Sequence, residues 1–175
     1  MATDFQKDAV SVLLREELET LKQRIITNMR NANEVASGRT IKSMHVTADM
    51  TGGTLFGRSP FGTLETGRKA GKVPYGFRDI IYRWMQDKGI HAAPKPYVRG
   101  GQHKYDPQQR GDLSMASAIA YTIRTKGSKL YRNGGRADIY SNVIPDTIKR
   151  IGDRIMSLIH TSIDSIKING KEEIS

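Results

Sequence analysis

LETGRKAGKVP, the sequence of residues 64–74, is the stretch around which the rest of this chain is arranged. It lies between a segment that predicts a β-hairpin and a segment that predicts an amphipathic helix. Gly67, Gly71 and Pro74 do not suit a helix interior, so the stretch is predicted to be a loop with several special backbone positions. Its four charged side chains, one acidic and three basic, must then face water or a partner.

A small antiparallel sheet is predicted before this loop. Residues 40–50 contain β-branched and alternating apolar side chains, which is typical of a strand. A Thr-Gly-Gly turn at 51–53 and the apolar run at 54–57 complete a hairpin, because paired glycines between short apolar runs favour a tight turn. Two further short strands are expected to extend this sheet, at residues 130–131 and 137–140.

Long amphipathic helices are predicted near both ends of the chain. Apolar residues recur at steps of three and four within residues 4–33 and again within residues 144–166, which gives each segment an apolar face. The second stripe has nearly heptad spacing, so this helix is expected to pack on the domain or on a neighbouring subunit. That stripe consists of Ile148, Ile151, Ile155, Leu158 or Ile159, Ile163 and Ile166.

Two shorter helices are predicted between the long ones. Pro74 opens the first and Gly89 ends it, and its apolar face is expected to bury Trp84, the only tryptophan. The second helix covers residues 114–125 and ends at Gly127. Its inward face is expected to consist of Met115, Ala118, Ile119 and Ile123.

The segment between the two shorter helices is predicted to be an extended arm. Residues 91–112 are rich in proline, glycine and basic residues and lack apolar periodicity, so they can bury little surface alone. We expect this arm to be mobile in the free subunit and to order against a neighbour, with Tyr97 and Tyr105 as anchors. Residues 167–175 are expected to be a flexible tail. The predicted fold is α+β, with a small antiparallel sheet flanked by long N- and C-terminal amphipathic helices.

Length and composition favour a single domain over residues 1–175. The chain is 37% hydrophobic and 26% charged, which is ordinary for a soluble protein with a core. It contains no cysteine, which excludes disulfides, thiolate zinc sites and thiol catalysis. We expect neither a secretory signal nor a membrane-spanning segment, because no apolar run approaches about 18 residues.

The net charge of +10 is distributed unevenly along the chain. Residues 1–57 hold seven basic and seven acidic residues, residues 58–110 hold eleven and four, and residues 111–175 hold ten and seven. Glycines beside lysine and arginine suit sequence-independent contact with phosphates, and a solvated basic face is the plain alternative. The residues expected to contact DNA or an acidic partner are Arg68, Lys69, Lys72, Lys126, Lys129, Arg132 and Arg136.

No constellation in the sequence predicts catalysis. The four histidines lack metal-ligand spacing with one another, and the central part of the chain has too few acidic residues for a paired-carboxylate or metal-dependent hydrolase site. The sequence contains neither a Walker-type phosphate loop nor a nucleophile elbow. We therefore expect no catalytic residues, no cofactor and no metal.

The order of these features resembles that of a known protein family. A long helix is followed by a Gly-Arg-Thr step at residues 38–40, a hairpin with a Gly-Gly tip and a Glu-x-Gly turn at residues 65–67, before the Trp helix, the arm and the last helix. This order is similar to that of the neck and tail-completion proteins of tailed bacteriophages. The resemblance covers residues 5–166. The chain departs from the family by inserting the Trp helix and the basic arm after the Glu-x-Gly turn.

The resemblance implies a virion structural protein, a subunit of a head–tail connector ring that joins portal and tail. Its partners would be copies of itself, the portal and the adjoining connector and tail proteins, and it would be assembled in the host cytoplasm. Basic loops would face DNA in the channel, and Ile155 and Ile159 would contribute subunit contacts with the arm. Such a ring forms when the contacts are heterologous and the rotation between subunits closes. The alternatives are a free-standing protein that binds nucleic acid without sequence preference, favoured by the charge, and a small hydrolase.

Overall fold

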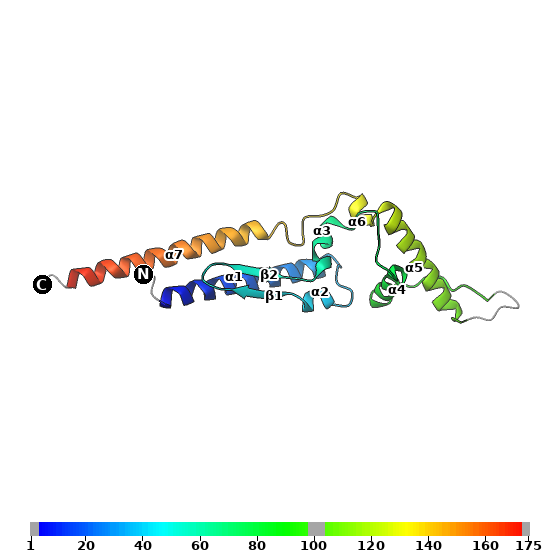
Figure 1. Cartoon of the computed structure of the whole chain (residues 1–175), viewed down its shortest axis with the longest axis horizontal. Coiled ribbons are helices and arrows are strands. Elements are labelled where there is room, and N and C mark those ends of the chain that lie inside the picture. The colour runs from blue at the N-terminus through cyan, green and yellow to red at the C-terminus, as the bar shows by residue number, and fades with distance from the viewer. Residues whose placement is uncertain (1–3, 98–103, 173–175) are drawn as a thin grey trace. The chain divides into compact units, whose positions relative to one another are not determined.

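The computed structural model describes residues 4–97 and 104–172, with side chains described from residue 8 to 97 and from 104 to 164. The α+β fold is confirmed: long helices lie near both ends of the chain, and the described residues contain one two-stranded antiparallel sheet (Figure 1). The elements are α1 (Asp4–Asn31), α2 (Arg39–Lys42), β1 (His45–Ala48), β2 (Gly53–Phe56), η1 (Ser59–Gly62), α3 (Thr63–Thr66), α4 (Phe77–Asp87), α5 (Pro107–Lys126), α6 (Lys129–Arg132) and α7 (Ile144–Glu172).

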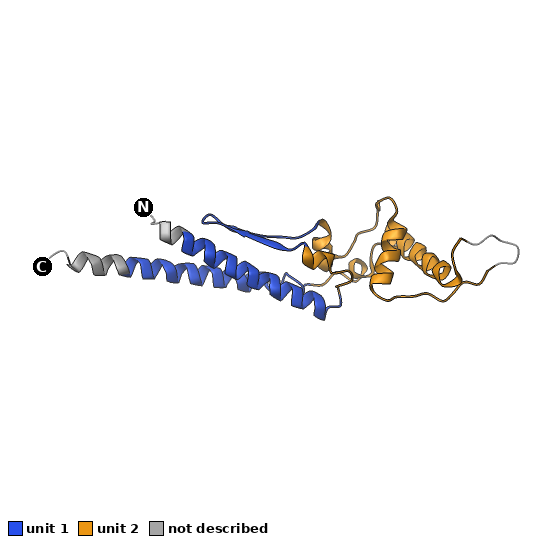
Figure 2. Ribbon diagram, turned by 90° about the horizontal axis from the view of Figure 1, so that it is seen from below, with its two compact units in different colours: residues 1–33, 43–58, 137–175 blue, residues 34–42, 59–136 orange. Residues whose placement is uncertain are grey.

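Length and composition favoured a single domain. The contacts between residues instead divide the chain into two compact units, which are described separately below (Figure 2). Unit 1 consists of residues 1–33, 43–58 and 137–175. Unit 2 consists of residues 34–42 and 59–136.

Unit 1 is built on α1, which packs against the hairpin and against α7. The three-and-four spacing predicted for α1 is confirmed by its buried face. This face consists of Leu14, Leu18, Leu21, Ile25 and Met29, and it forms a core with Met44, Ile139 and Val143. The core therefore combines segments from the beginning, the middle and the end of the sequence.

The hairpin pairs β1 with β2 in a register that places Val46 opposite Leu55. Its turn is held by Asp49, whose carboxylate accepts hydrogen bonds from the backbone N–H of Thr51 at 2.7 Å and of Gly52 at 3.1 Å. A hydrogen bond from the Thr51 hydroxyl, together with these two backbone bonds, lowers the pKa of Asp49. At Gly53 a Cβ would lie 2.5 Å from Leu18 Cδ1, so the absence of a side chain lets the hairpin approach α1 closely.

Two strand predictions are wrong, and a third is confirmed with a later start. Residues 39–42 form the helical turn α2, so the strand expected from residue 40 begins at His45. The strand expected at residues 130–131 is α6, because the Ser128 hydroxyl caps this turn and accepts a hydrogen bond from Tyr131 N at 3.2 Å. Residues 138–140 lie in a turn, and Ile139 is buried in the unit 1 core instead of extending the sheet.

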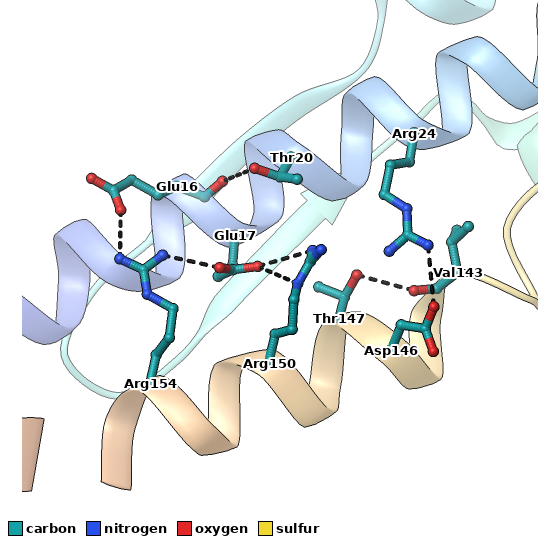
Figure 3. Close-up of polar contacts among 9 residues, drawn as sticks. All are labelled: Glu16, Glu17, Thr20, Arg24, Val143, Asp146, Thr147, Arg150 and Arg154. Atoms are coloured by element: carbon teal, nitrogen blue, oxygen red, sulfur yellow. Dashed lines mark hydrogen bonds and ion pairs between the residues drawn. The ribbon is translucent and has the colours of Figure 1, made fainter. Parts of the chain in front are cut away.

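A buried carboxylate joins α7 to α1 (Figure 3). Glu17, which is only 7% exposed, accepts hydrogen bonds from Arg154 Nη1 at 2.9 Å and from Arg150 Nε at 3.1 Å. Arg154 also donates to Glu16 at 2.9 Å, and the hydrogen bonds to Glu17 and Glu16 raise the pKa of Arg154. The two helices are thus positioned by charge as well as by apolar packing.

The apolar stripe predicted on α7 is only partly covered within one chain. Ile151, Ile155 and Leu158 are half-buried, whereas Ile148 is 65% exposed and Ile159 is 46% exposed. The side of α7 that meets α1 is instead occupied largely by buried Thr147 and the two arginines that bind Glu17. The helix continues to Glu172, so residues 167–172 of the expected tail are helical, and residues 173–175 lie outside the described part.

Unit 2 is centred on the packing of α4 against α5. Its core consists of Ile81, Met85 and Ala116, with Phe77, Ile119 and Ile123 packed around them. The predicted burial of Trp84 is wrong, since the buried side of α4 follows the four-residue spacing of Phe77, Ile81 and Met85 and leaves Trp84 38% exposed. Met115 and Ala118 are also exposed, because the inward stripe of α5 passes through Ala116.

The predicted arm is shorter than residues 91–112. The helix α5 begins at Pro107, because Asp106 caps it and accepts a hydrogen bond from Gln109 N at 2.8 Å. Proline at the first helical position fits this start, since its missing N–H would have no partner there. Residues 107–112 are therefore helical, and residues 98–103 of the arm lie outside the described part.

The Glu17 contacts predict a stability effect in unit 1. Replacing Glu17→Ala should lower the free energy of unfolding by about 1–2 kcal/mol, because a buried acceptor shared by two arginines is lost while both arginines can partly rehydrate. Denaturant unfolding of both proteins measures the difference.

Glu19→Ala is the matched control, because Glu19 is half-exposed and, among the residues with described side chains, pairs only with Lys22 within α1. An exposed pair of this kind is worth roughly 0.5 kcal/mol or less. Equal losses for the two variants would contradict the role given to Glu17.

Candidate polyanion-binding surface

The excess positive charge of the chain belongs to unit 2. Residues 34–42 and 59–136 hold 17 basic and six acidic residues, whereas the rest of the chain holds 11 and 12. Unit 2 therefore carries a net charge of +11 and unit 1 a net charge of −1. The division does not follow the order of the sequence, because unit 1 is assembled from three separate segments.

Backbone hydrogen bonds bring two basic segments of unit 2 together. Gly71 N donates to Arg124 O at 2.8 Å, and Ser128 N donates to Arg68 O at 2.8 Å. Ser128 Oγ in turn accepts a hydrogen bond from Arg68 N at 2.9 Å. The loop at residues 67–72 is thereby held against the end of α5 and the start of α6.

Glycine makes this approach possible. Gly67 and Gly127 have φ angles of +68° and +82°, a region that residues with a Cβ rarely adopt. A Cβ on Gly67 would overlap the backbone of Tyr131, and one on Gly127 would lie 2.9 Å from Arg68 O. Gly67, in the loop, therefore lies against the backbone of α6. Gly127, at the end of α5, lies against the backbone of the loop.

The resulting surface is basic and nearly free of acidic groups. Residues 66–78 and 113–137, which include the two joined segments, contain no aspartate or glutamate. Five of the residues predicted to bind DNA or an acidic partner are exposed there, and within the described residues none of their side chains makes a hydrogen bond or ion pair. These five, called the basic surface below, are Lys69, Lys72, Lys126, Lys129 and Arg132.

Two of the predicted contact residues have structural partners. Arg68 is half-buried, donates to Lys72 O at 2.9 Å and lies over the ring of Phe77 at 5.4 Å. Arg136 is half-buried and pairs with Glu34 at 3.1 Å. Their charges contribute to the local potential, but their side chains hold the unit together, so we do not include them in the basic surface.

Residues 91–97 lie along α5 and are fixed there by Asp112. This carboxylate is 2% exposed and accepts hydrogen bonds from Ala92 N at 2.7 Å, His91 Nδ1 at 3.0 Å and Gln108 Nε2 at 3.1 Å. These bonds, the one from Ala92 N–H first, lower the pKa of Asp112 to about 2. The sequence alone gave no sign of this buried acid, because a lone aspartate in a polar stretch resembles a surface residue.

The two tyrosines predicted as anchors are accessible but already meet cations of their own segment. Tyr97 is 52% exposed and lies 5.6 Å from the guanidinium of Arg110. Tyr105 is 36% exposed and lies 5.4 Å from the ammonium of Lys104. Their role in subunit contacts stays a prediction, as does that of Ile155 and Ile159.

Two polar pairs on α5 resemble parts of catalytic dyads. Lys95 Nζ donates to Ser114 Oγ at 2.5 Å, and His91 is paired with Asp112. The Lys95 side chain is exposed. Among the described residues, no three His, Asp or Glu side chains converge as metal ligands would.

Comparison of the chain with protein-family models, curated proteins and solved structures gives no match. In the part of the chain that the structure describes, no helix has the length and apolar content needed to cross a membrane.

Asp112 predicts a pH dependence of stability. Its pKa is about 2 in the folded chain against an ordinary value of 3.8, so its contribution to stability is complete above about pH 4 and is lost as the pH falls through 2. Thermal unfolding between these pH values should show a smaller loss for Asp112→Asn than for the unmodified chain. Asp106→Asn, which keeps an N-cap residue, should retain the original slope. Equal slopes for all three proteins would contradict the assignment.

Proposed function

We propose that this chain is a non-catalytic structural subunit of a head–tail connector ring in a tailed bacteriophage, and that unit 2 faces DNA in the channel. The observation that carries the proposal is the basic surface, on which two acid-free segments meet within a unit of charge +11. The resemblance of the sequence to phage neck and tail-completion proteins supplies the setting. Portal and tail proteins would then be its neighbours in the virion.

The basic surface suits a polyanion that slides past it. Its five side chains are long, exposed and unpaired, so they can follow phosphates without fixing one register. Phosphate contacts of this kind supply affinity but carry no sequence information. A channel that passes any genome segment requires contact of this type.

The two units suit different tasks in a ring. Unit 1 is nearly neutral and exposes apolar side chains on α7, whereas unit 2 carries the repulsive charge. Contacts between subunits are therefore more favourable through unit 1. Rings seen by electron microscopy of the purified chain without DNA would support this arrangement.

A free-standing nucleic-acid-binding protein is the second candidate, and exposed tyrosines favour it. Tyr75, Tyr121 and Tyr131 belong to unit 2 and are 105%, 69% and 40% exposed. Aromatic rings among cations can stack on unpaired bases. Tighter binding of single-stranded than of duplex DNA, weakened by Tyr131→Ala, would favour this candidate over the connector.

The basic surface predicts a defined salt dependence. A triple substitution of Lys69→Gln, Lys126→Gln and Lys129→Gln should weaken binding to a short DNA duplex and reduce the slope of log K against log salt by roughly 2–3, since each lost phosphate contact contributes about 0.9. Fluorescence anisotropy over a range of salt concentrations measures the slope.

The matched control removes the same charge from unit 1, by Arg15→Gln, Arg30→Gln and Arg58→Gln, at three exposed positions. This variant should keep most of the slope. Equal effects of the two triple substitutions would show that total charge alone governs binding and would contradict a dedicated surface.

A further inference from the structure

The outer side of α7 is an exposed apolar face. Ile148, Met156, Ile159 and Ile163 are 65%, 54%, 46% and 45% exposed, with exposed Gly152 among them. At about 100° per residue these positions gather on one side of the helix and span roughly 22 Å along it. Because α1 meets a different side of α7, this face is uncovered in the single chain. An apolar face of this extent marks an interaction site.

We propose that two copies of this chain pair through this face, with their α7 helices antiparallel about a two-fold axis near Met156 and Ser157. The paired surface consists of the four apolar side chains on the outer side of α7 and of the charged residues along its edge. Unit 2 takes no part in the contact.

The charges beside the apolar face argue for a protein as its occupant. Asp153 and Asp164 are exposed along its edge, where Lys149 precedes Asp153 by one turn and His160 precedes Asp164 by one turn. Acidic groups at this position repel the phosphates of DNA and of anionic lipids. Helices that bind membrane surfaces instead carry lysine and arginine along the polar side.

The order of the same charges argues for a second copy. In an antiparallel pair centred between residues 156 and 157, Lys149 lies level with Asp164 of the second copy, and Asp153 lies level with His160. All four residues lie on the same edge of the helix, and in an antiparallel two-fold pair that edge meets its own counterpart. Lys149 therefore meets an aspartate of opposite charge twice in the pair, and each Asp153 meets a histidine ring that can donate a hydrogen bond to it. In a parallel two-fold pair this edge would instead face the other edge of the partner helix, at Ile151, Ile155 and Ser162, which carries no charge.

Net charge also favours a contact between copies through unit 1 over one through unit 2. Two copies that approach through unit 2 would bring charges of +11 together, whereas unit 1 has 11 basic and 12 acidic residues. Pairing through α7 keeps the basic surface free for a polyanion. It also adds a contact that covers the large apolar side chains left exposed in the single chain.

The pair goes beyond the proposed function and does not depend on it. A two-fold contact cannot be the heterologous contact of a ring with a polar axis, so the pair describes the free chain before assembly. In a ring, a neighbouring subunit would replace the second copy on the same face.

Molecular mass in solution tests the pair. The full chain should be a dimer at micromolar concentration, and the double substitution Met156→Lys and Ile159→Lys should raise the dissociation constant at least tenfold. Both positions are exposed, so the fold should be retained, which circular dichroism checks. Val12→Lys, at a residue of α1 that is also 54% exposed, should remain dimeric. A monomeric unmodified chain, or an α7 variant that still dimerises, would overturn the proposal.

Disulfide cross-linking tests the relative direction of the two α7 helices. The chain has no cysteine of its own, so disulfides form only between the introduced cysteines. A mixture of Lys149→Cys and Asp164→Cys chains should form disulfide-linked heterodimers under mild oxidation, and neither variant alone should cross-link efficiently. Efficient linking of each variant with itself, or no linking in the mixture, would overturn the antiparallel arrangement.

Discussion

The close backbone approach between residues 67–71 and residues 124–131 is the constraint on which the candidate site depends. It requires Gly67 and Gly127, because side chains at either position would meet the backbone of the other segment. Three hydrogen bonds of 2.8–2.9 Å then hold two basic segments together that are about 60 residues apart in the sequence. Like charges gathered in this way repel one another, and a polyanion relieves that repulsion.

Unit 1 differs from unit 2 in how its charges are used. Its charges are balanced and several of them are paired, and the Glu17 contacts with Arg150 and Arg154 fix α7 on α1. The polar side of α7 is thus used inside the unit, which leaves its apolar side outward. An exposed apolar surface of this kind favours association with another protein surface. The apolar exposed face thus belongs to unit 1, and the excess of basic residues belongs to unit 2.

The sequence predicted what local patterns determine. Three-and-four spacing located α1 and α7, and the Thr-Gly-Gly turn located the hairpin. It failed where a single cap decided the outcome, since Asp106 starts a helix inside the predicted arm and Ser128 starts one where a strand was expected. The sequence also did not predict contacts between residues that lie far apart along the chain. The pairing of Arg136 with Glu34 and the burial of Asp112 depend on residues that meet only after folding.

Lysine reactivity tests whether DNA binds the basic surface of unit 2. Acetylation of the full chain, read by mass spectrometry with and without a DNA duplex at moderate salt, reports each lysine separately. If DNA binds this surface, it should protect four lysines of unit 2, Lys69, Lys72, Lys126 and Lys129. It should leave Lys22 and Lys149 of unit 1 as reactive as before. Equal protection in both units, or protection confined to unit 1, would contradict binding at this surface.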